Sequence, residues 1–422
     1  MLFSLSVDKR YVPKVWKIGA ITPIPKIPKP SVNDIRPISI LPTPVKLLET
    51  IVLQQTKHLF MEKFDKQQFG FRSGSSTFCA LLYLDDHITR ILDDQTTVGA
   101  IVISYDLSKA FDKLPHEKIL QRLCDLEFPH SFIDWVTSYL EQRQQYVRIG
   151  VHNSQPTNIT SGVPQGSILG PLFFVTTVGS YINETNGCVI KYADDTTLCF
   201  PILKNDTDYS LTSIYREHER ITQWSNRIGL PINRAKSKCM TIKKSKSCPT
   251  PSLPNVENVD TLRILGVNFN SKWNADSHIV KIVAVASRRL YALRIMRNSL
   301  SKDQMTLVFN SLVRSLIEHC APLFLGHSSR NSSKLDRLQK RFHRLICGES
   351  CTGSCLQSLG ERRELLSLRF LDNVMKPNHI LHSLLPHISN SGRFCLPSRR
   401  TTKRSLSFFP LICEIYNHSL SR

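Results

Sequence analysis

The chain of 422 residues carries 55 Lys and Arg against 34 Asp and Glu, which gives a formal net charge of +21 at pH 7. This length allows several subdomains around a sizeable core, and the positive charge favours a polyanionic partner such as nucleic acid. No stretch approaches the roughly 20 apolar residues of a membrane span, and the charged stretch 1–13 does not resemble a secretory signal. The 12 Cys form no C-x-x-C pair, so we expect reduced thiols and an intracellular protein of the nucleus or the cytoplasm.

The first informative element is a strand predicted over Gly99–Tyr105, an apolar run that ends at Asp106. Leu107–Asp112 follows and leads into a helix predicted over about His116–Cys124. An Asp at the end of a buried strand can direct its oxygens toward a neighbouring hairpin. An ordinary helix cap or strand end also accounts for Asp106 on its own, but not for the carboxylates that come later in the chain.

The next segment, Ser161–Pro171, is typical of a rigid turn, with glycines on both sides of Pro164-Gln165. The backbone of such a turn can approach a ligand closely. The apolar run Leu172–Val175 predicts the start of a buried helix. Loops of this composition are common, and this one becomes informative because it lies between Asp106 and a second acidic motif.

That motif, Tyr192–Asp195, lies between the apolar runs Cys188–Ile190 and Thr197–Phe200, a pattern that predicts a β-hairpin with two adjacent carboxylates at its tip. Two charges ~4 Å apart repel by about 1 kcal/mol in water and about 4 kcal/mol at an effective dielectric near 20. A divalent cation removes this repulsion, although a solvated turn is the commoner explanation of Asp194-Asp195 alone. With Asp106, the pair offers the hard oxygen ligands that Mg²⁺ prefers. Two such ions about 3.5–4 Å apart would suit an in-line phosphoryl displacement.

The last third of the chain is basic and is predicted to be helical. From Ser271 to Arg422 there are 24 Lys and Arg residues against 9 Asp and Glu. Apolar residues recur at helical spacing over Ile279–Leu293, Met305–Leu316 and Lys334–Ile346. These stripes are more typical of a core than of a ligand site, whereas the interleaved Arg residues indicate a surface that follows phosphates.

With these motifs in this order, the sequence resembles the reverse transcriptases of non-LTR (LINE-type) retrotransposons. Blocks on both sides of the acidic motifs agree with the resemblance. The matching segments are Trp16-Lys17, Ile21–Lys26, Arg36–Ser39, Gln68–Gly74, Asp106–Asp112, Gly162–Gly170, Tyr192–Asp195, Asn233, Lys236 and Leu265–Val267. The resemblance therefore extends over most of the chain.

The resemblance implies an α+β protein with the right-hand polymerase fold of fingers, an antiparallel-sheet palm and a helical thumb. We expect the fingers at 1–80, the palm with the acidic motifs at 81–270 and the thumb at 271–347. In 348–422 Pro, Ser and basic residues alternate, so this basic C-terminal region is assigned no compact domain. A zinc site is conceivable at the border, although the spacing matches no zinc signature, on His343, Cys347, Cys351 and Cys355.

By the same resemblance, the metal ligands and catalytic carboxylates are Asp106, Asp194 and Asp195. They would hold two Mg²⁺ ions, for which Mn²⁺ could substitute, and the backbone carbonyl of Leu107 would face the second ion. Phe111 would pack against the sugar of the incoming nucleotide, where it leaves no room for a 2′-hydroxyl and favours deoxyribonucleotides. An ordinary core aromatic at a strand–helix corner is the alternative explanation of Phe111.

Five further residues would contact the substrate or assist the reaction. Gln165 and Gly166 would lie beneath the nucleotide or the template base. Arg36 and Arg72 would contact the triphosphate, with surface salt bridges as the alternative for both. Lys236 would protonate the leaving pyrophosphate, unless it is an ordinary solvated lysine in a basic segment.

The implied function is that of an RNA-directed DNA polymerase acting on an RNA template, a DNA primer and deoxynucleoside triphosphates. No membrane is involved, and the oligomeric state stays open. One alternative is a truncated, non-catalytic nucleic-acid-binding relic of such an element, because the chain begins almost at the first polymerase block without a preceding endonuclease. Another is a polymerase of different template use, such as an intron-maturase-like or RNA-templated RNA polymerase, which Phe111 disfavours where ribonucleotides are the substrate.

Overall fold

The computed structural model describes residues 2–31, 34–181, 187–326, 329–347 and 357–420. At its centre is a five-stranded sheet in the order β10-β9-β3-β8-β7, antiparallel except for the parallel pair of β10 and β9. Its strands are β3 (Thr97–Asp106), β7 (Cys188–Tyr192), β8 (Asp195–Leu203), β9 (Lys238–Lys243) and β10 (Glu257–Asn258). The strand predicted to end at Asp106 and the hairpin predicted around Tyr192–Asp195 are therefore both confirmed.

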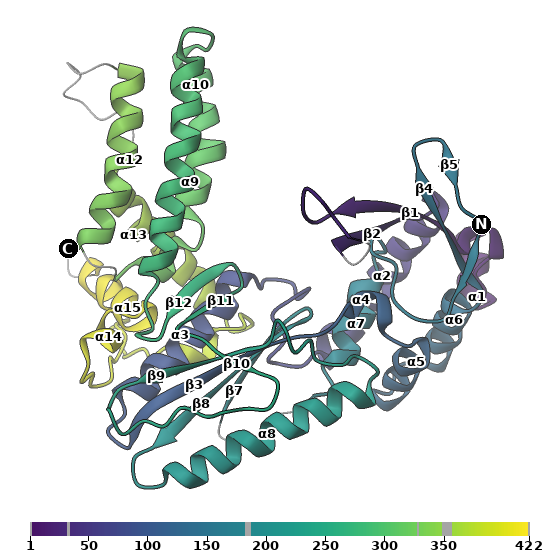
Figure 1. The fold of residues 1–422 in the computed structure, drawn as a ribbon, viewed down its shortest axis with the longest axis horizontal. Coiled ribbons are helices and arrows are strands. Elements are labelled where there is room, and N and C mark those ends of the chain that lie inside the picture. Colours follow the sequence, from purple (N-terminus) through teal and green to yellow (C-terminus); the bar gives the residue numbers. More distant parts are fainter. Residues whose placement is uncertain (1, 32–33, 182–186, 327–328, 348–356, 421–422) are drawn as a thin grey trace.

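Strand β3 is an unbroken apolar run because both faces of the sheet are covered. Ile101 and Ile103 pack in the core that contains Ile214 of α8 (Thr207–Arg227). The alternate residue Val102 packs in a second core with Leu81 of α3 (Thr77–Asp93). Since successive side chains of a strand point to opposite faces, burial on both faces requires apolar residues at every position. Figure 1 shows α3 and α8 on opposite sides of the sheet.

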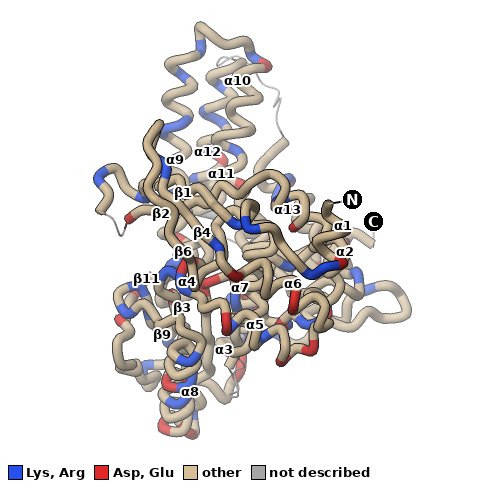
Figure 2. The backbone as a smooth tube through the Cα atoms, turned by 90° about the vertical axis from the view of Figure 1, so that its right-hand side faces the viewer, with Lys and Arg blue, Asp and Glu red and all other residues tan. Residues whose placement is uncertain are grey.

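A second sheet belongs to the N-terminal part of the molecule (Figure 2). Its order is β2-β1-β4-β5, and β6 also pairs with β4. The strands are β1 (Ile18–Pro25), β2 (Ile35–Ile40), β4 (Arg143–Ile149), β5 (His152–Asn153) and β6 (Thr157–Ile159). Residues 143–159 thus join a sheet with residues 18–40, although the sequence range expected for the palm includes them. The helices around this sheet and below it are α1 (Leu2–Asp8), η1 (Lys14–Lys17), α2 (Thr43–Lys63), α4 (Ala110–Lys113), α5 (His116–Asp125), α6 (His130–Leu140) and α7 (Gly170–Val178).

Three long helical segments form a stack on the side of the central sheet opposite the N-terminal sheet. In the chain they follow the hairpin of β11 (Thr261–Ile264) and β12 (Val267–Asn270). The three predicted helices are confirmed, and the second continues through a π-helical stretch. Phe309 and Phe342 stack at 3.7 Å between ring centroids in their common core. The elements are α9 (Asp276–Ile295), η3 (Met296–Asn298), α10 (Lys302–Phe309), η4 (Asn310–Arg314), α11 (Ser315–Glu318) and α12 (Ser329–Cys347).

The C-terminal segment packs on the α3 side of the central sheet. Phe408, Phe409 and Ile412 share one core with Leu81 and Val102. The sequence pattern indicated no compact unit here, because the apolar residues are sparse and their packing partner lies some 300 residues earlier. The elements are η5 (Ala321–Phe324), α13 (Leu359–Val374), η6 (His382–Leu384), α14 (Thr402–Ser405) and α15 (Phe408–Ser419). Cys351 and Cys355 of the conceivable zinc site lie outside the described residues.

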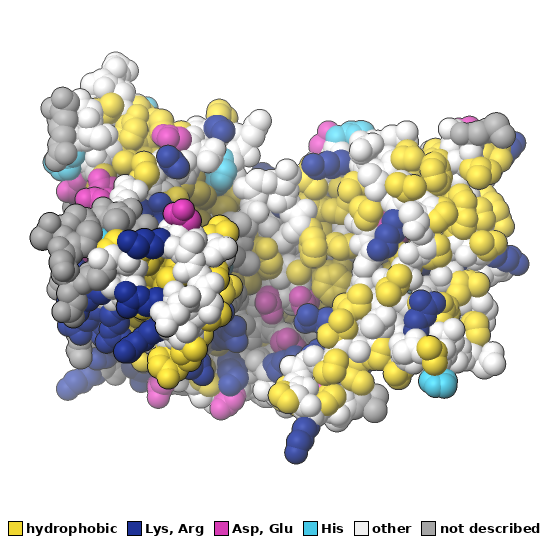
Figure 3. Space-filling view, turned by 90° about the horizontal axis from the view of Figure 1, so that it is seen from above, with side chains coloured by type: hydrophobic (Ala, Val, Ile, Leu, Met, Phe, Trp, Pro, Cys, Tyr) yellow, Lys and Arg dark blue, Asp and Glu magenta, His cyan; other side chains and the backbone are white. Residues whose placement is uncertain are grey.

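The N-terminal sheet and the helical stack stand on opposite sides of the end of the central sheet (Figure 1). Seen from above, a hollow separates them, with acidic side chains at its floor and basic side chains nearby (Figure 3). Within the described residues, no helix is both long enough and apolar enough to cross a membrane.

Candidate active site

Three carboxylates from two distant parts of the sequence lie at one end of the central sheet. Asp106 is the last residue of β3, and it pairs in register with Asp195, the first residue of β8. Asp194 precedes it in the two-residue turn of the β7–β8 hairpin, which closes at the pair Tyr192 and Asp195. The antiparallel register thus brings together the residues that the sequence separates by almost 90 positions.

The tip of this hairpin is held by the segment that precedes α3. The Gln68 side-chain carbonyl accepts hydrogen bonds from the backbone N–H groups of Gly70 (2.8 Å) and Ala193 (3.2 Å). Ala193 has a φ of 57°, which costs a non-glycine residue about 1–2 kcal/mol. Gly70 is required at its position, since a Cβ there would lie 2.6 Å from the Ala193 nitrogen. The hairpin tip is therefore fixed from outside its own strands.

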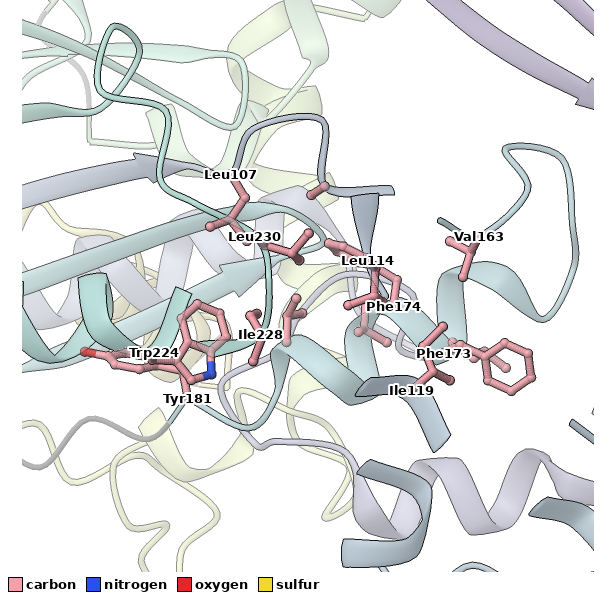
Figure 4. Close-up of a cluster of buried hydrophobic side chains, with 14 of the residues drawn as sticks. Leu107, Leu114, Ile119, Val163, Phe173, Phe174, Tyr181, Trp224, Ile228 and Leu230 are labelled. Atoms are coloured by element: carbon pink, nitrogen blue, oxygen red, sulfur yellow. The ribbon is translucent and has the colours of Figure 1, made fainter. Parts of the chain in front are cut away.

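Asp106 is held on the other side by residues 231–237. The Asn233 N–H donates to the Asp106 carbonyl at 2.7 Å, and the Asp106 N–H donates to the Ser237 hydroxyl at 3.4 Å. Leu107 stands opposite Ile232 in an isolated bridge, and its side chain is buried in the core shown in Figure 4. Because that side chain points away, only the backbone of Leu107 can face the carboxylates.

The carboxylates repel one another in partly dehydrated surroundings. Loss of water raises the pKa of Asp194, and the negative charge of Asp106 raises it further. The pKa of Asp195 is raised to about 6. Loss of water is the largest cause, and the negative charges of Asp194 and Asp106 add to it. Lys236 and Arg36 oppose the shift at Asp194. A cation between these oxygens would remove the repulsion.

The donor set fits Mg²⁺ or Mn²⁺, since all three side chains offer hard oxygen ligands. In the part of the chain that the structure describes, no group of three Asp, Glu, His or Cys side chains converges closely enough to hold an ion. Asp106 instead has the Lys236 ammonium 3.4 Å from its Oδ2. Since the Lys236 side chain is 64% exposed, this contact is weak and an ion could replace it.

The glycine-rich loop connects the carboxylate region to the N-terminal sheet. The Ser39 N–H of β2 donates to the Gln165 carbonyl at 2.9 Å, and the Gln165 amide donates to Asp112 at 2.7 Å. Gly166 has a φ of 139°, and a Cβ there would collide with the Ser39 carbonyl oxygen. The loop therefore runs against β2 with Gly166 exposed.

Phe111 packs against two aromatic rings and is still partly exposed. Its ring stacks on Phe174 at 4.1 Å between centroids and meets Phe71 edge-on at 6.4 Å. The ring is only half-buried, so the alternative that Phe111 is an ordinary core aromatic accounts only for its stacked face. Arg36 is exposed on β2, where its charge acts on Asp194. Arg72 donates to the carbonyl of Asp65, and no described contact joins it to the carboxylates.

Sequence patterns did not reveal Glu49 of α2, a fully buried carboxylate that anchors the glycine-rich loop. Its Oε2 accepts from the Ile168 N–H at 2.6 Å, and its Oε1 accepts from the Ser167 hydroxyl at 3.1 Å and from Tyr139. A single Glu in an amphipathic helix is usually solvated, so no local signal distinguishes Glu49. Arg263 of β11 was also missed, and it lines a cavity of about 30 Å³ together with Asp195.

Replacing Glu49 with Gln is expected to destabilise the chain by roughly 1–3 kcal/mol, because one carboxylate acceptor becomes an amide donor facing the donors of the loop. The free energy of unfolding in urea measures this change. The matched control is Glu62→Gln, since Glu62 lies exposed on the same helix. Equal unfolding midpoints for the two variants would show that the loop does not depend on Glu49.

Known proteins are similar to this chain over most of its length. The family model described as reverse transcriptase (RNA-dependent DNA polymerase) matches residues 27–269. A probable RNA-directed DNA polymerase from transposon BS of Drosophila melanogaster is 28% identical over 371 residues, covering 82% of this chain and 40% of that protein. The RNA-directed DNA polymerase from mobile element jockey of the same organism is 27% identical, covering 82% of this chain and 39% of its own length. The chain thus spans about two fifths of the length of these relatives.

Among solved structures, telomerase from Candida tropicalis in complex with a fragment of telomeric RNA has a TM-score of 0.45 at 12% identity, covering 91% of this chain and 67% of that chain. The match to the family model includes both acidic motifs, the glycine-rich loop and the strands that carry them. The α+β class and the antiparallel central sheet expected of the palm are also present. The chain therefore belongs to the reverse transcriptase family.

Proposed function

We propose that the chain is an RNA-directed DNA polymerase that extends a DNA primer along an RNA template with deoxynucleoside triphosphates. The observation that carries this proposal is the pairing of Asp106 with Asp195 beside Asp194, at the end of a sheet that faces an open hollow. The mutual repulsion and raised pKa values of Asp194 and Asp195 support a role in binding cations.

The residues that would hold two Mg²⁺ ions are Asp106, Asp194, Asp195 and the carbonyl of Leu107, and Mn²⁺ would suit the same oxygens. Bound ions of this kind activate a hydroxyl nucleophile and neutralise charge on the transferred phosphate and its leaving group. The rigid backbone around Asp106 and Ala193 would keep the ligands in place as the primer 3′-hydroxyl attacks the α-phosphate of the nucleotide.

The remaining residues would position the substrate. Phe111, backed by Phe174, would present the exposed part of its ring to the sugar of the nucleotide and exclude a 2′-hydroxyl. Gln165 and Gly166 would lie under the base pair, since the loop is braced against β2. The positive charges of Arg36, and of Arg72 after a change of side-chain conformation, would attract the triphosphate, and Lys236 would donate a proton to pyrophosphate.

Primer extension on an RNA template tests the proposal. With Mg²⁺ and deoxynucleotides the wild-type chain should extend the primer, whereas ribonucleotides should be poor substrates. Phe111→Val should raise ribonucleotide use about tenfold or more, because a steric pocket of this kind discriminates by ~1–3 kcal/mol. A folded wild-type chain that binds the primer–template but does not extend it would instead be the non-catalytic relic. Efficient use of ribonucleotides by the wild type would indicate an RNA polymerase.

A further inference from the structure

A basic pocket lies beside helix α6, which Figure 1 shows on the opposite side of the molecule from the helical stack. It is a pocket of about 510 Å³ between residues 9–17 and helix α6, which we call the Lys17 pocket. None of the residues that line it belongs to the carboxylate site. The charged and aromatic residues of its lining are Lys9, Arg10, Tyr11, Lys14, Lys17, Asp134 and Glu141. Figure 2 shows the corresponding basic positions along the N-terminal segment beside α6.

Lys17 is the unusual member of this lining, because it is only 3% exposed and yet forms no ion pair among those found in the described residues. The ammonium nitrogen of Lys17 lies over the ring of Tyr11, 5.8 Å from its centroid. Loss of water lowers the pKa of Lys17. The charge of Glu141 opposes this shift, whereas the charges of Arg143 and Lys14 add to it. A buried ammonium without a bound anion is costly. An anion that enters the pocket would offset that cost.

The rest of the lining favours an anion as well. Four cationic side chains face two carboxylates, and one of these, Asp134, is already paired with Arg10 at 2.8 Å. Lys9 and Lys14 are exposed, so their long side chains can adjust to a ligand. The pocket is therefore positive overall, with the buried Lys17 and the exposed Lys9 and Lys14 in its lining.

The exposed ring of Tyr11 favours a nucleic-acid strand over an acidic peptide as the anion. It is 50% exposed beside the cations, so it offers an aromatic face next to a phosphate-sized charge. Base stacking on an exposed aromatic, combined with a nearby positive groove, is the usual arrangement for single-stranded nucleic acid. An acidic peptide carries no base that would stack on the Tyr11 ring.

We propose that the Lys17 pocket binds a backbone phosphate of a single-stranded nucleic acid whose adjacent base stacks on Tyr11. This is a strand contact remote from the carboxylates and independent of nucleotide transfer. RNA and DNA share the phosphate and the base, and the binding experiment compares the two.

The experiment measures binding of the full chain to a labelled single-stranded 12-mer by fluorescence anisotropy, with RNA and DNA probes, at several salt concentrations and without Mg²⁺ or nucleotides. The test variant is Lys9→Ala/Lys14→Ala. Its matched control is Lys204→Ala/Lys246→Ala, which removes the same charge from exposed positions at the opposite end of the central sheet. The test variant should bind more weakly, and its plot of log K against log salt should lose a slope of about 0.7 for each phosphate contact removed. Equal losses in both variants would show a non-specific charge effect and overturn the proposal.

Two further substitutions separate binding from folding. Lys17→Met should weaken binding while leaving the melting temperature unchanged or higher, because it removes a buried charge that has no anion in the free protein. A lower melting temperature with unchanged binding would make Lys17 a structural residue and overturn the proposal. Tyr11→Ala should weaken binding about tenfold, whereas Tyr11→Phe, which keeps the ring, should bind like the wild type. Equal binding by the two Tyr11 variants would exclude stacking.

The same assay on Asp106→Ala keeps this proposal apart from the proposed polymerase. That variant should bind the single strand like the wild type, because the Lys17 pocket shares no residue with the carboxylate site. If a variant loses extension but keeps binding, the result tests only the role of the carboxylates. If a variant loses binding at the pocket but keeps extension, the result tests only the Lys17 pocket.

Discussion

Primer extension should fall about 10³-fold or more when Asp106 is replaced with Ala, while the chain remains folded. Charge stabilisation by bound metal is worth several kcal/mol, and each 1.36 kcal/mol corresponds to a factor of ten in rate. Asp106 lies at the end of β3 opposite Asp195, so its removal takes one ligand from the shared site. Initial rates on an RNA template measure the effect.

Folding should survive this substitution because Asp106 repels its neighbours. The negative charge of Asp106 raises the pKa of both Asp194 and Asp195, so its loss should lower the pKa of Asp195 from its value of about 6. The exposed Lys236 loses only a weak contact. The matched control is Asp372→Ala, since Asp372 is exposed on α13 and should leave extension unchanged. Extension by Asp106→Ala at the rate of this control would refute the assignment of the metal site.

The second large effect concerns stability. Arg404→Ala is expected to destabilise the chain by about 3 kcal/mol, the lower end of the cost of breaking a buried ion pair, because the buried Asp86 carboxylate then keeps only the half-exposed Arg90, at 2.7 Å, as its ion-pair partner. Arg404 and Asp86 form an ion pair of 2.7 Å with side chains 6% and 3% exposed, and Arg404 also donates to Thr89 at 2.9 Å. Unfolding in urea measures the change, with fluorescence of Trp273 as a local probe, since its indole N–H donates to the neighbouring Asp85 at 3.0 Å.

The control for this prediction is Arg400→Ala, an exposed arginine in the same segment. A double variant, Asp86→Leu/Arg404→Met, should recover much of the lost stability, because two apolar residues of similar volume can replace a buried ion pair. If Arg404→Ala unfolded at the same urea concentration as Arg400→Ala, the C-terminal segment would contribute little to the fold. The expected loss instead makes residues 399–420 part of the body that contains the central sheet.

The sequence by itself determined the elements that depend on local patterns. The apolar run before Asp106, the alternation around Tyr192–Asp195 and the stripe over Ile279–Leu293 each have the period of the element that forms, so the strand, hairpin and helix lie where they were predicted. The order of the acidic motifs also indicated the family, because motif order is a property of the linear sequence and does not depend on the fold.

Tertiary structure alone decided which of these elements meet. Strand β4 pairs with β1 across more than 100 residues, and Arg404 reaches Asp86 across 318 residues. Glu49 and Lys17 look like ordinary charged residues of helical segments, yet both are buried by partners that no local pattern identifies. Burial of a charge depends on long-range packing, which a period of two or 3.6 residues does not encode. The anchor of the glycine-rich loop and the Lys17 pocket therefore emerged only from the folded chain.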